Sequence, residues 1–129
     1  MIILTGGAGF IGSNLLQKLN NLHYKDIVLF DNLNKLKKKN IAQLSFKSIY
    51  FKDEIFNFLK SNKKKISTIF HFGACTNTLE KNWDYLYKNN FEYSKKLAIY
   101  SAQNKIKFIY ASSASIYGKK TGNFDEIKN

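Results

Sequence analysis

The chain has 129 residues, enough for one domain, and its 44% hydrophobic content is ordinary for a globular protein. All 21 basic residues behind its net charge of +12 are Lys, which favours codon drift in an AT-rich genome over a nucleic-acid partner, because Arg is the usual reader of bases and phosphates. No apolar run approaches the ~20 residues of a membrane span, and the N-terminus does not resemble a signal peptide. The one cysteine, Cys75, allows no internal disulfide. We therefore expect a cytoplasmic protein without a membrane partner.

Residues 1–12, MIILTGGAGFIG, predict a buried strand followed by a glycine turn and a helix. Gly6, Gly9 and Gly12 have the G-x-x-G-x-x-G spacing. Glycine is favoured at these positions for three reasons: it allows a tight turn with positive φ, it lets a pyrophosphate approach the backbone, and it lets the helix pack closely on the strand. The free N–H groups at the start of the helix would then face the phosphates. This context predicts a dinucleotide-binding site.

The first helix continues over residues 13–22 and has apolar side chains at helical spacing. We expect the following of them to face the sheet: Ile11, Leu15, Leu16, Leu19 and Leu22. Residues 26–30 predict a second buried strand, and Asp31 follows it at once, where an acidic residue is the expected partner of the adenosine ribose hydroxyls. The alternative role for Asp31 is that of a helix cap. The lysine-rich segment 32–39 predicts a solvated loop or helix, but it begins where a 2′-phosphate would lie and so permits NADP.

Three further strands are predicted over residues 48–51, 66–72 and 106–110. A short helix follows Lys52-Asp53, with Ile55, Phe56 and Leu59 on one side. A long helix is predicted over residues 82–103, and one face of it carries Trp83, Leu86, Asn90, Tyr93, Leu97 and Tyr100. Residues 111–118 and beyond are predicted to be irregular.

Strands that alternate with helices predict an α/β fold of the Rossmann type, a doubly wound parallel sheet with strand order 3-2-1-4-5. The carboxyl ends of these strands would bring four stretches of chain to one crevice: residues 6–12, Asp31, residues 73–76 and residues 111–115.

Several motifs occur together: TGGAGFIGSN at 5–14, DNL at 31–33, HFGACTNT at 71–78, NN at 89–90 and YASSA at 110–114. This combination resembles the extended short-chain dehydrogenase/reductase family, and within it the ADP-heptose 6-epimerases, over nearly the whole chain. The resemblance implies NADP as cofactor, with NAD as the alternative, an ADP-sugar substrate, and a homo-oligomer for the full-length protein. It also implies interconversion of ADP-D-glycero- and ADP-L-glycero-D-manno-heptose by transient oxidation at C6″, for lipopolysaccharide core synthesis.

Carried over by matched position, the resemblance implies Phe10 and Ile11 over the pyrophosphate, Asp31 and Asn32 on the ribose, and Lys38 near the 2′-phosphate. It implies Asp53 near the adenine and Ser113 as the catalytic serine. No metal site is expected. The implied cofactor-binding set is Gly6, Gly9, Phe10, Ile11, Gly12, Asp31, Asn32, Lys38, Lys52, Asp53, Phe72, Gly73, Ala74, Cys75, Thr76 and Asn89. Two positions depart from the family: Phe72, where Glu is usual, and Lys52-Asp53, where the Lys usually stands one place later.

His71 ends a buried strand, and we predict a hydrogen-bonded core residue rather than an acid or base. Cys75 has no identifiable basic partner that would make it a nucleophile. None of the eight tyrosines, Tyr117 included, has Lys four residues later, so the family's Tyr-x-x-x-Lys pair is expected beyond Asn129. We therefore expect residues 1–129 to form the cofactor-binding domain without its substrate-binding region, and to be inactive alone.

Two alternatives stay open. One is a related sugar-nucleotide 4-epimerase, dehydratase or reductase. The other is a non-catalytic dinucleotide-binding module, favoured by the missing Tyr and Lys.

Overall fold

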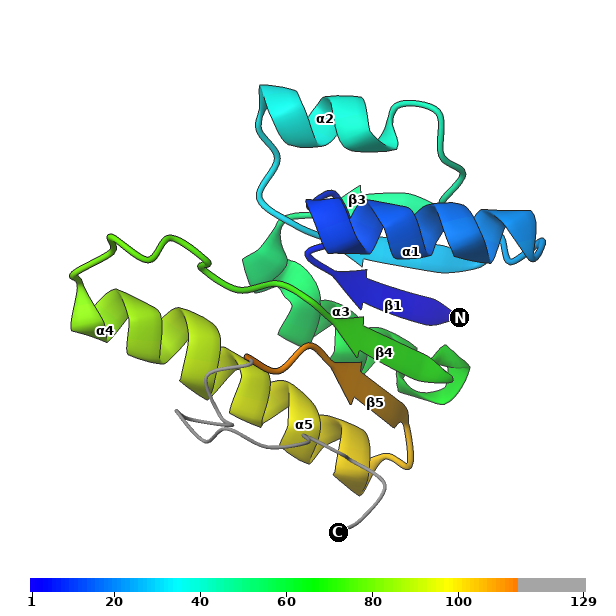
Figure 1. Ribbon diagram of the computed structural model, residues 1–129. Helices are drawn as coiled ribbons and strands as arrows, with labels where there is room; N and C mark the ends of the chain where they lie inside the picture. The colour runs from blue at the N-terminus through cyan, green and yellow to red at the C-terminus, as the bar shows by residue number, and fades with distance from the viewer. Residues whose placement is uncertain (114–129) are drawn as a thin grey trace, which may run out of the picture.

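The computed structural model describes residues 1–113, in which five parallel strands form one sheet with the order β3-β2-β1-β4-β5 (Figure 1). The strands are β1 (Ile2–Thr5), β2 (Ile27–Phe30), β3 (Ser48–Tyr50), β4 (Thr68–His71) and β5 (Lys107–Tyr110). The predicted fold class and strand order are confirmed. Of the predicted irregular tail, residues 114–129 lie outside the described residues, and Tyr117 is among them.

Helices cover both faces of the sheet. On one face lie α1 (Phe10–Asn21) and α2 (Lys35–Ile41), and on the other lie α3 (Ile55–Asn62) and α5 (Tyr93–Gln103) (Figure 1). The short helix α4 (Trp83–Leu86) lies on the side of α5, beyond the ends of the strands. Two short 3₁₀ turns, η1 (Lys52–Glu54) and η2 (Lys63–Lys65), flank α3. The chain has no segment within residues 1–113 that forms a helix long and apolar enough to cross a membrane.

The central strands β1, β2 and β4 are apolar because each contributes side chains to the cores on both faces of the sheet. On β1, Ile2 and Leu4 pack with Leu16 of α1, whereas Ile3 packs on the opposite face with Ile55 and Leu97. Ile3, Leu4, Leu16, Ile55 and Leu97 are completely buried. The sheet is therefore fixed on both sides, and only its edges and the strand ends meet solvent.

The helical spacing of α1 predicted too wide a buried face. Leu16 and Leu19 are buried and Leu15 packs partly on the core, but Ile11 is 58% exposed and Leu22 is 55% exposed. The prediction was wrong for Ile11 and Leu22 because they lie at the two ends of α1. Ile11 is in the first turn, and Leu22 caps the last one.

One continuous helix runs from Trp83 to Gln103, as predicted, but its middle part, η3 (Tyr87–Glu92), is a π-helix. Trp83 was expected on the packed face, and it is 80% exposed. The reason is that α4 extends past the ends of the strands, where no sheet lies beneath its first turn (Figure 1).

Candidate functional site

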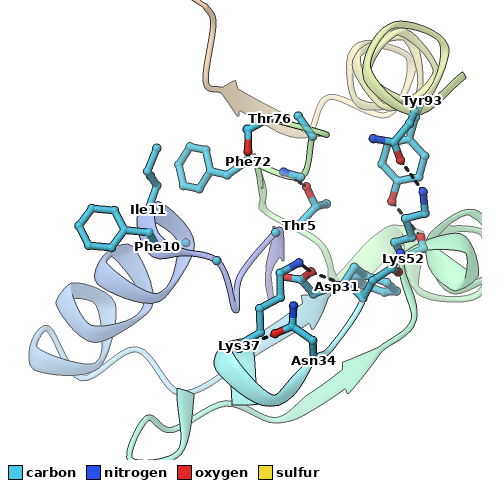
Figure 2. Close-up of a pocket in the computed structure, with 18 of the residues that line it drawn as sticks. Thr5, Phe10, Ile11, Asp31, Asn34, Lys37, Lys52, Phe72, Thr76 and Tyr93 are labelled. Carbon is cyan, nitrogen blue, oxygen red and sulfur yellow. Dashed lines mark hydrogen bonds and ion pairs between the residues drawn. The ribbon is translucent and has the colours of Figure 1, made fainter. Parts of the chain in front are cut away.

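A cavity of about 600 Å³ opens at the carboxyl ends of the strands. Its volume is within the range of small-molecule sites. Its walls come from the glycine turn, the end of β2, the start of α2, η1, the loop after β4 and the helix Trp83–Gln103 (Figure 2). The lining residues are Thr5, Gly6, Gly9, Phe10, Ile11, Gly12, Phe30, Asp31, Asn32, Asn34, Lys37, Lys52, Phe72, Gly73, Ala74, Thr76, Tyr85, Asn89 and Tyr93.

The glycine turn has the conformation that its sequence predicts. Gly6 has φ +67°, and a Cβ there would lie 2.7 Å from the Gly73 nitrogen. A Cβ on Gly12 would lie 2.2 Å from the Gly6 carbonyl oxygen, so only glycine lets α1 start this close to the turn. Gly9 caps the helix without a side-chain hydrogen bond, which leaves the start of α1 open toward the cavity.

Asp31 lies at the end of β2 and is 6% exposed. Its Oδ2 accepts a hydrogen bond from the Ala8 N–H at 3.0 Å, which ties the end of β2 to the glycine turn. Its Oδ1 accepts from the Asn32 N–H at 2.7 Å and from Lys37 Nζ at 2.5 Å. Lys37 comes from the first turn of α2, which Asn34 caps by accepting from the Lys37 N–H. The acidic group and its cation therefore share one wall of the cavity (Figure 2).

The opposite wall carries a second cation. Lys52 Nζ donates to Asn89 Oδ1 and lies 5.9 Å from the centre of the Tyr85 ring. Tyr93 donates its hydroxyl proton to the Lys52 carbonyl at 2.9 Å. Burial, together with the charges of Asp53 and Asp31, raises the pKa of Tyr93, so this phenol stays protonated and keeps its structural bond.

His71 is a hydrogen-bonded residue of the core, as predicted. It is 4% exposed, and its ring contacts Thr5 Oγ1 through Nδ1 at 2.5 Å and Ser94 Oγ through Nε2 at 2.7 Å. Burial lowers its pKa from 6.5 to about 4, so the ring is neutral near pH 7. Cys75 is a free, half-buried cysteine.

Thirteen of the sixteen predicted cofactor-binding residues line this one cavity, and the three that do not are Lys38, Asp53 and Cys75. Lys38 and Asp53 are exposed outside the lining, and Ser113 follows β5 as an exposed residue that does not line the cavity. The cofactor-binding role of the set stays a prediction.

The lining also contains residues outside the predicted set: Thr5, Phe30, Asn34, Lys37, Tyr85 and Tyr93. Two signals could have found most of them. Tyr85 and Tyr93 stand four residues before and after Asn89, hence on its side of the helix. Asn34 immediately precedes a lysine-rich helix, which is the position of a capping residue, and its cap places Lys37 in the first turn.

Comparisons with known proteins agree with this geometry. The family model described as "NAD dependent epimerase/dehydratase family" matches residues 2–129. Among curated proteins, the chain is 47% identical to an ADP-L-glycero-D-manno-heptose-6-epimerase of Brachyspira hyodysenteriae, over 98% of this chain and 41% of the relative. It is 42% identical to the protein of the same name from Alkalilimnicola ehrlichii, over 92% of this chain and 38% of the relative.

Among solved structures, a mutant UDP-glucuronic acid 4-epimerase of Bacillus cereus, in complex with UDP-4-deoxy-4-fluoro-glucuronic acid and NAD, superposes with a TM-score of 0.81. It is 29% identical and aligns with 98% of this chain and 44% of its own. The chain thus spans about two fifths of the length of the relatives that it matches.

Proposed function

Because this chain belongs to the NAD-dependent epimerase/dehydratase family, we propose that residues 1–129 form the dinucleotide-binding domain of a sugar-nucleotide epimerase that acts on ADP-heptose. The observation that carries the proposal is the convergence of the glycine turn, Asp31 and the loop 73–76 on one cavity. The substrate rests on the two curated relatives, which are both named for ADP-heptose.

The residues present fit a dinucleotide. A pyrophosphate fits beside Gly9, where the start of α1 is open. Within residues 1–113, the only heavy atom near a Cβ added at Gly9, its chain neighbours aside, is the Gly6 carbonyl oxygen at 3.2 Å. The adenosine ribose belongs at Asp31 and Asn32, and the loop 73–76 and Asn89 extend the same surface away from them. A bound nicotinamide supplies the hydride acceptor and donor that an epimerisation through transient oxidation requires.

We further propose that the cofactor is NADP rather than NAD. Lys37 neutralises Asp31 at 2.5 Å, which removes the charge that would repel a 2′-phosphate. Lys37 lines the cavity, whereas Lys38 does not. The phosphate-binding role that the resemblance implies for Lys38 is therefore assigned to Lys37 in this proposal.

Ser113 is proposed to donate a hydrogen bond to a substrate oxygen, since it follows β5 on the carboxyl side of the sheet. Proton transfer during epimerisation needs a group of tuned pKa, and general acid–base catalysis supplies ~10²–10⁴ in rate. The 129 residues contain no Tyr-x-x-x-Lys pair. We therefore expect residues 1–129 alone to bind the dinucleotide without turning over ADP-heptose.

A chimera tests the proposal. Residues 1–129 replace the matching part of the Brachyspira hyodysenteriae relative, which supplies the remaining length. The chimera should invert ADP-heptose, leave UDP-glucose unchanged, and lose most of its turnover on Ser113→Ala. A chimera that folds and binds NADP but does not invert ADP-heptose would contradict the proposal. The second candidate is a UDP-sugar 4-epimerase, which the structural likeness to the Bacillus cereus enzyme favours. Measurable turnover by residues 1–129 alone would show that another acid–base group is present.

A further inference from the structure

The side chain of Asn90 is bound to both backbone groups of one residue in the loop after β4. Asn90 Oδ1 accepts from the Cys75 N–H at 2.7 Å, and Asn90 Nδ2 donates to the Cys75 carbonyl at 3.0 Å. On either side of Cys75, Ala74 and Thr76 line the cavity, but neither Cys75 nor Asn90 does. Asn90 therefore acts on the cavity through the loop and not by touching its contents.

Asn90 and its neighbour Asn89 both lie in the π-helix η3 and are hydrogen-bonded to each other. Asn89 accepts from Lys52 in the cavity wall and donates through Nδ2 to Asn90 Oδ1 at 2.8 Å. Such π turns occur frequently at functional sites.

A chain of hydrogen bonds also fixes the backbone of Asn90. Ser94 donates its hydroxyl proton to the Asn90 carbonyl at 2.6 Å, so the Ser94 oxygen accepts from His71 Nε2. The neutral His71 ring then carries its proton on Nε2, and its Nδ1 accepts from the Thr5 hydroxyl. The oxygen of Thr5 in turn accepts from the Gly73 N–H at 3.2 Å.

The loop is thus held at two points, at Gly73 through Thr5 and at Cys75 through Asn90, and His71 connects the two. We propose that Asn90 is a positioning residue, which holds the loop 73–76 in the conformation that receives the dinucleotide; this inference rests on the proposed function. A loop fixed before binding loses less conformational entropy when the ligand arrives, so its affinity is higher.

The chain offers a matched control for Asn90. Asn20, near the end of α1, makes the same pair of bonds with Ser45: its Nδ2 donates to the Ser45 carbonyl at 2.8 Å, and its Oδ1 accepts from the Ser45 N–H at 2.7 Å. Both asparagines are half-buried, and neither Asn20 nor Ser45 lines the cavity. Loss of either pair should lower stability similarly, but only Asn90 should affect dinucleotide binding.

The experiment compares Asn90→Ala with Asn20→Ala in the 129-residue chain. Amide hydrogen exchange of the free proteins reports on the Cys75 and Ser45 amides, and calorimetry gives the Kd for NADP. We expect Asn90→Ala to expose the Cys75 amide to exchange and to raise the Kd for NADP at least tenfold. Asn20→Ala should expose the Ser45 amide and leave the Kd within twofold. Asn90→Asp keeps the acceptor for the Cys75 N–H and should restore part of the protection and part of the affinity.

Two results overturn the inference: an unchanged Kd in Asn90→Ala despite the loss of Cys75 protection, or an equal loss of affinity in Asn20→Ala. If the unmodified chain binds no NADP or NAD, the proposed function fails by itself. Hydrogen exchange then still decides whether Asn90 holds the loop. If the Cys75 amide stays protected in Asn90→Ala, Asn90 does not hold the loop; if the protection is lost, Asn90 holds it.

Discussion

The carboxylate of Asp31 and the ammonium group of Lys37 form an ion pair at 2.5 Å in the wall of the cavity. The Asp31 side chain is 5% exposed and that of Lys37 is 31% exposed, so the pair is only partly open to solvent. Asp31 also accepts from two backbone N–H groups, those of Ala8 and Asn32. The acidic residue at the end of β2 is therefore compensated within the protein, and this decides what we expect of cofactor choice.

We predict that Lys37→Gln lowers the affinity for NADP about tenfold, since hydrogen bonds to charged groups contribute roughly 1.5–3 kcal/mol. The affinity for NAD should change little, because NAD has no 2′-phosphate. Calorimetry of both dinucleotides at low ionic strength measures the change. The preference for NADP should also weaken with added salt, as screening shortens the Debye length to ~8 Å at physiological ionic strength.

Lys38→Gln is the matched control, because Lys38 is the next residue of the same helix but lies outside the cavity lining. The affinities of Lys38→Gln for NADP and NAD should stay within twofold of those of the unmodified chain. A larger loss of NADP binding in Lys38→Gln than in Lys37→Gln would contradict the assignment and restore Lys38 as the phosphate ligand.

The buried ring of His71 should make stability depend on pH. Its pKa is about 4 in the folded chain and 6.5 when unfolded, so the unfolded state binds the extra proton first as the pH falls. The stabilisation is present above pH 6.5 and is lost between pH 6.5 and about 4, by roughly 3 kcal/mol at most. The groups that face the ring, Thr5, Ser94, Tyr93 and Phe108, do not titrate in this window.

Urea unfolding at pH 7, 6, 5 and 4.5 measures this dependence in the unmodified chain and in His71→Gln. The variant removes the titrating group, so the difference in unfolding free energy between the two proteins should shrink as the pH falls. A constant difference across the series would mean that His71 does not titrate as its burial requires.

Ser101 in α5 is a site where a smaller side chain should stabilise the fold. It is completely buried, and its Oγ has no hydrogen-bond partner within residues 1–113. An unsatisfied buried polar group costs about 1–3 kcal/mol, so Ser101→Ala should raise the unfolding free energy by about 1 kcal/mol. Ser61→Ala in α3 is the control: its hydroxyl is exposed and bonds to the Asn57 carbonyl, so only the small gain in helix propensity remains. Equal gains in thermal melts of the two variants would contradict the explanation.

The sequence predicted the architecture because its signals are local and repeated. Each buried strand is a short apolar run, and the glycine spacing together with Asp31 indicates the strand order. Helical periodicity located α1 but could not show where the sheet ends beneath it, which is why Ile11 and Leu22 were misplaced.

Side-chain partners were harder to predict than elements. Lys37 and Lys38 are adjacent in a run of lysines, and only the cap at Asn34 and the resulting direction of α2 distinguish them. The bonds of Asn90 to Cys75 join the π-helix η3 to a loop 15 residues earlier in the chain, and no local pattern in residues 87–92 indicates them. Such features arise from tertiary contacts between segments that are distant in the chain.

Titration of NADP into the 129-residue chain and into Gly9→Val tests the central claim most directly. Gly9 has φ −73° and ψ 176°, an extended conformation that valine can adopt, and the nearest neighbour of an added Cβ is the Gly6 carbonyl oxygen at 3.2 Å. We expect both proteins to fold, the unmodified chain to bind NADP, and Gly9→Val to show no binding, because its side chain occupies the place of the pyrophosphate. Equal affinity in the two folded proteins, or no binding by the unmodified chain, would contradict a dinucleotide site at the glycine turn.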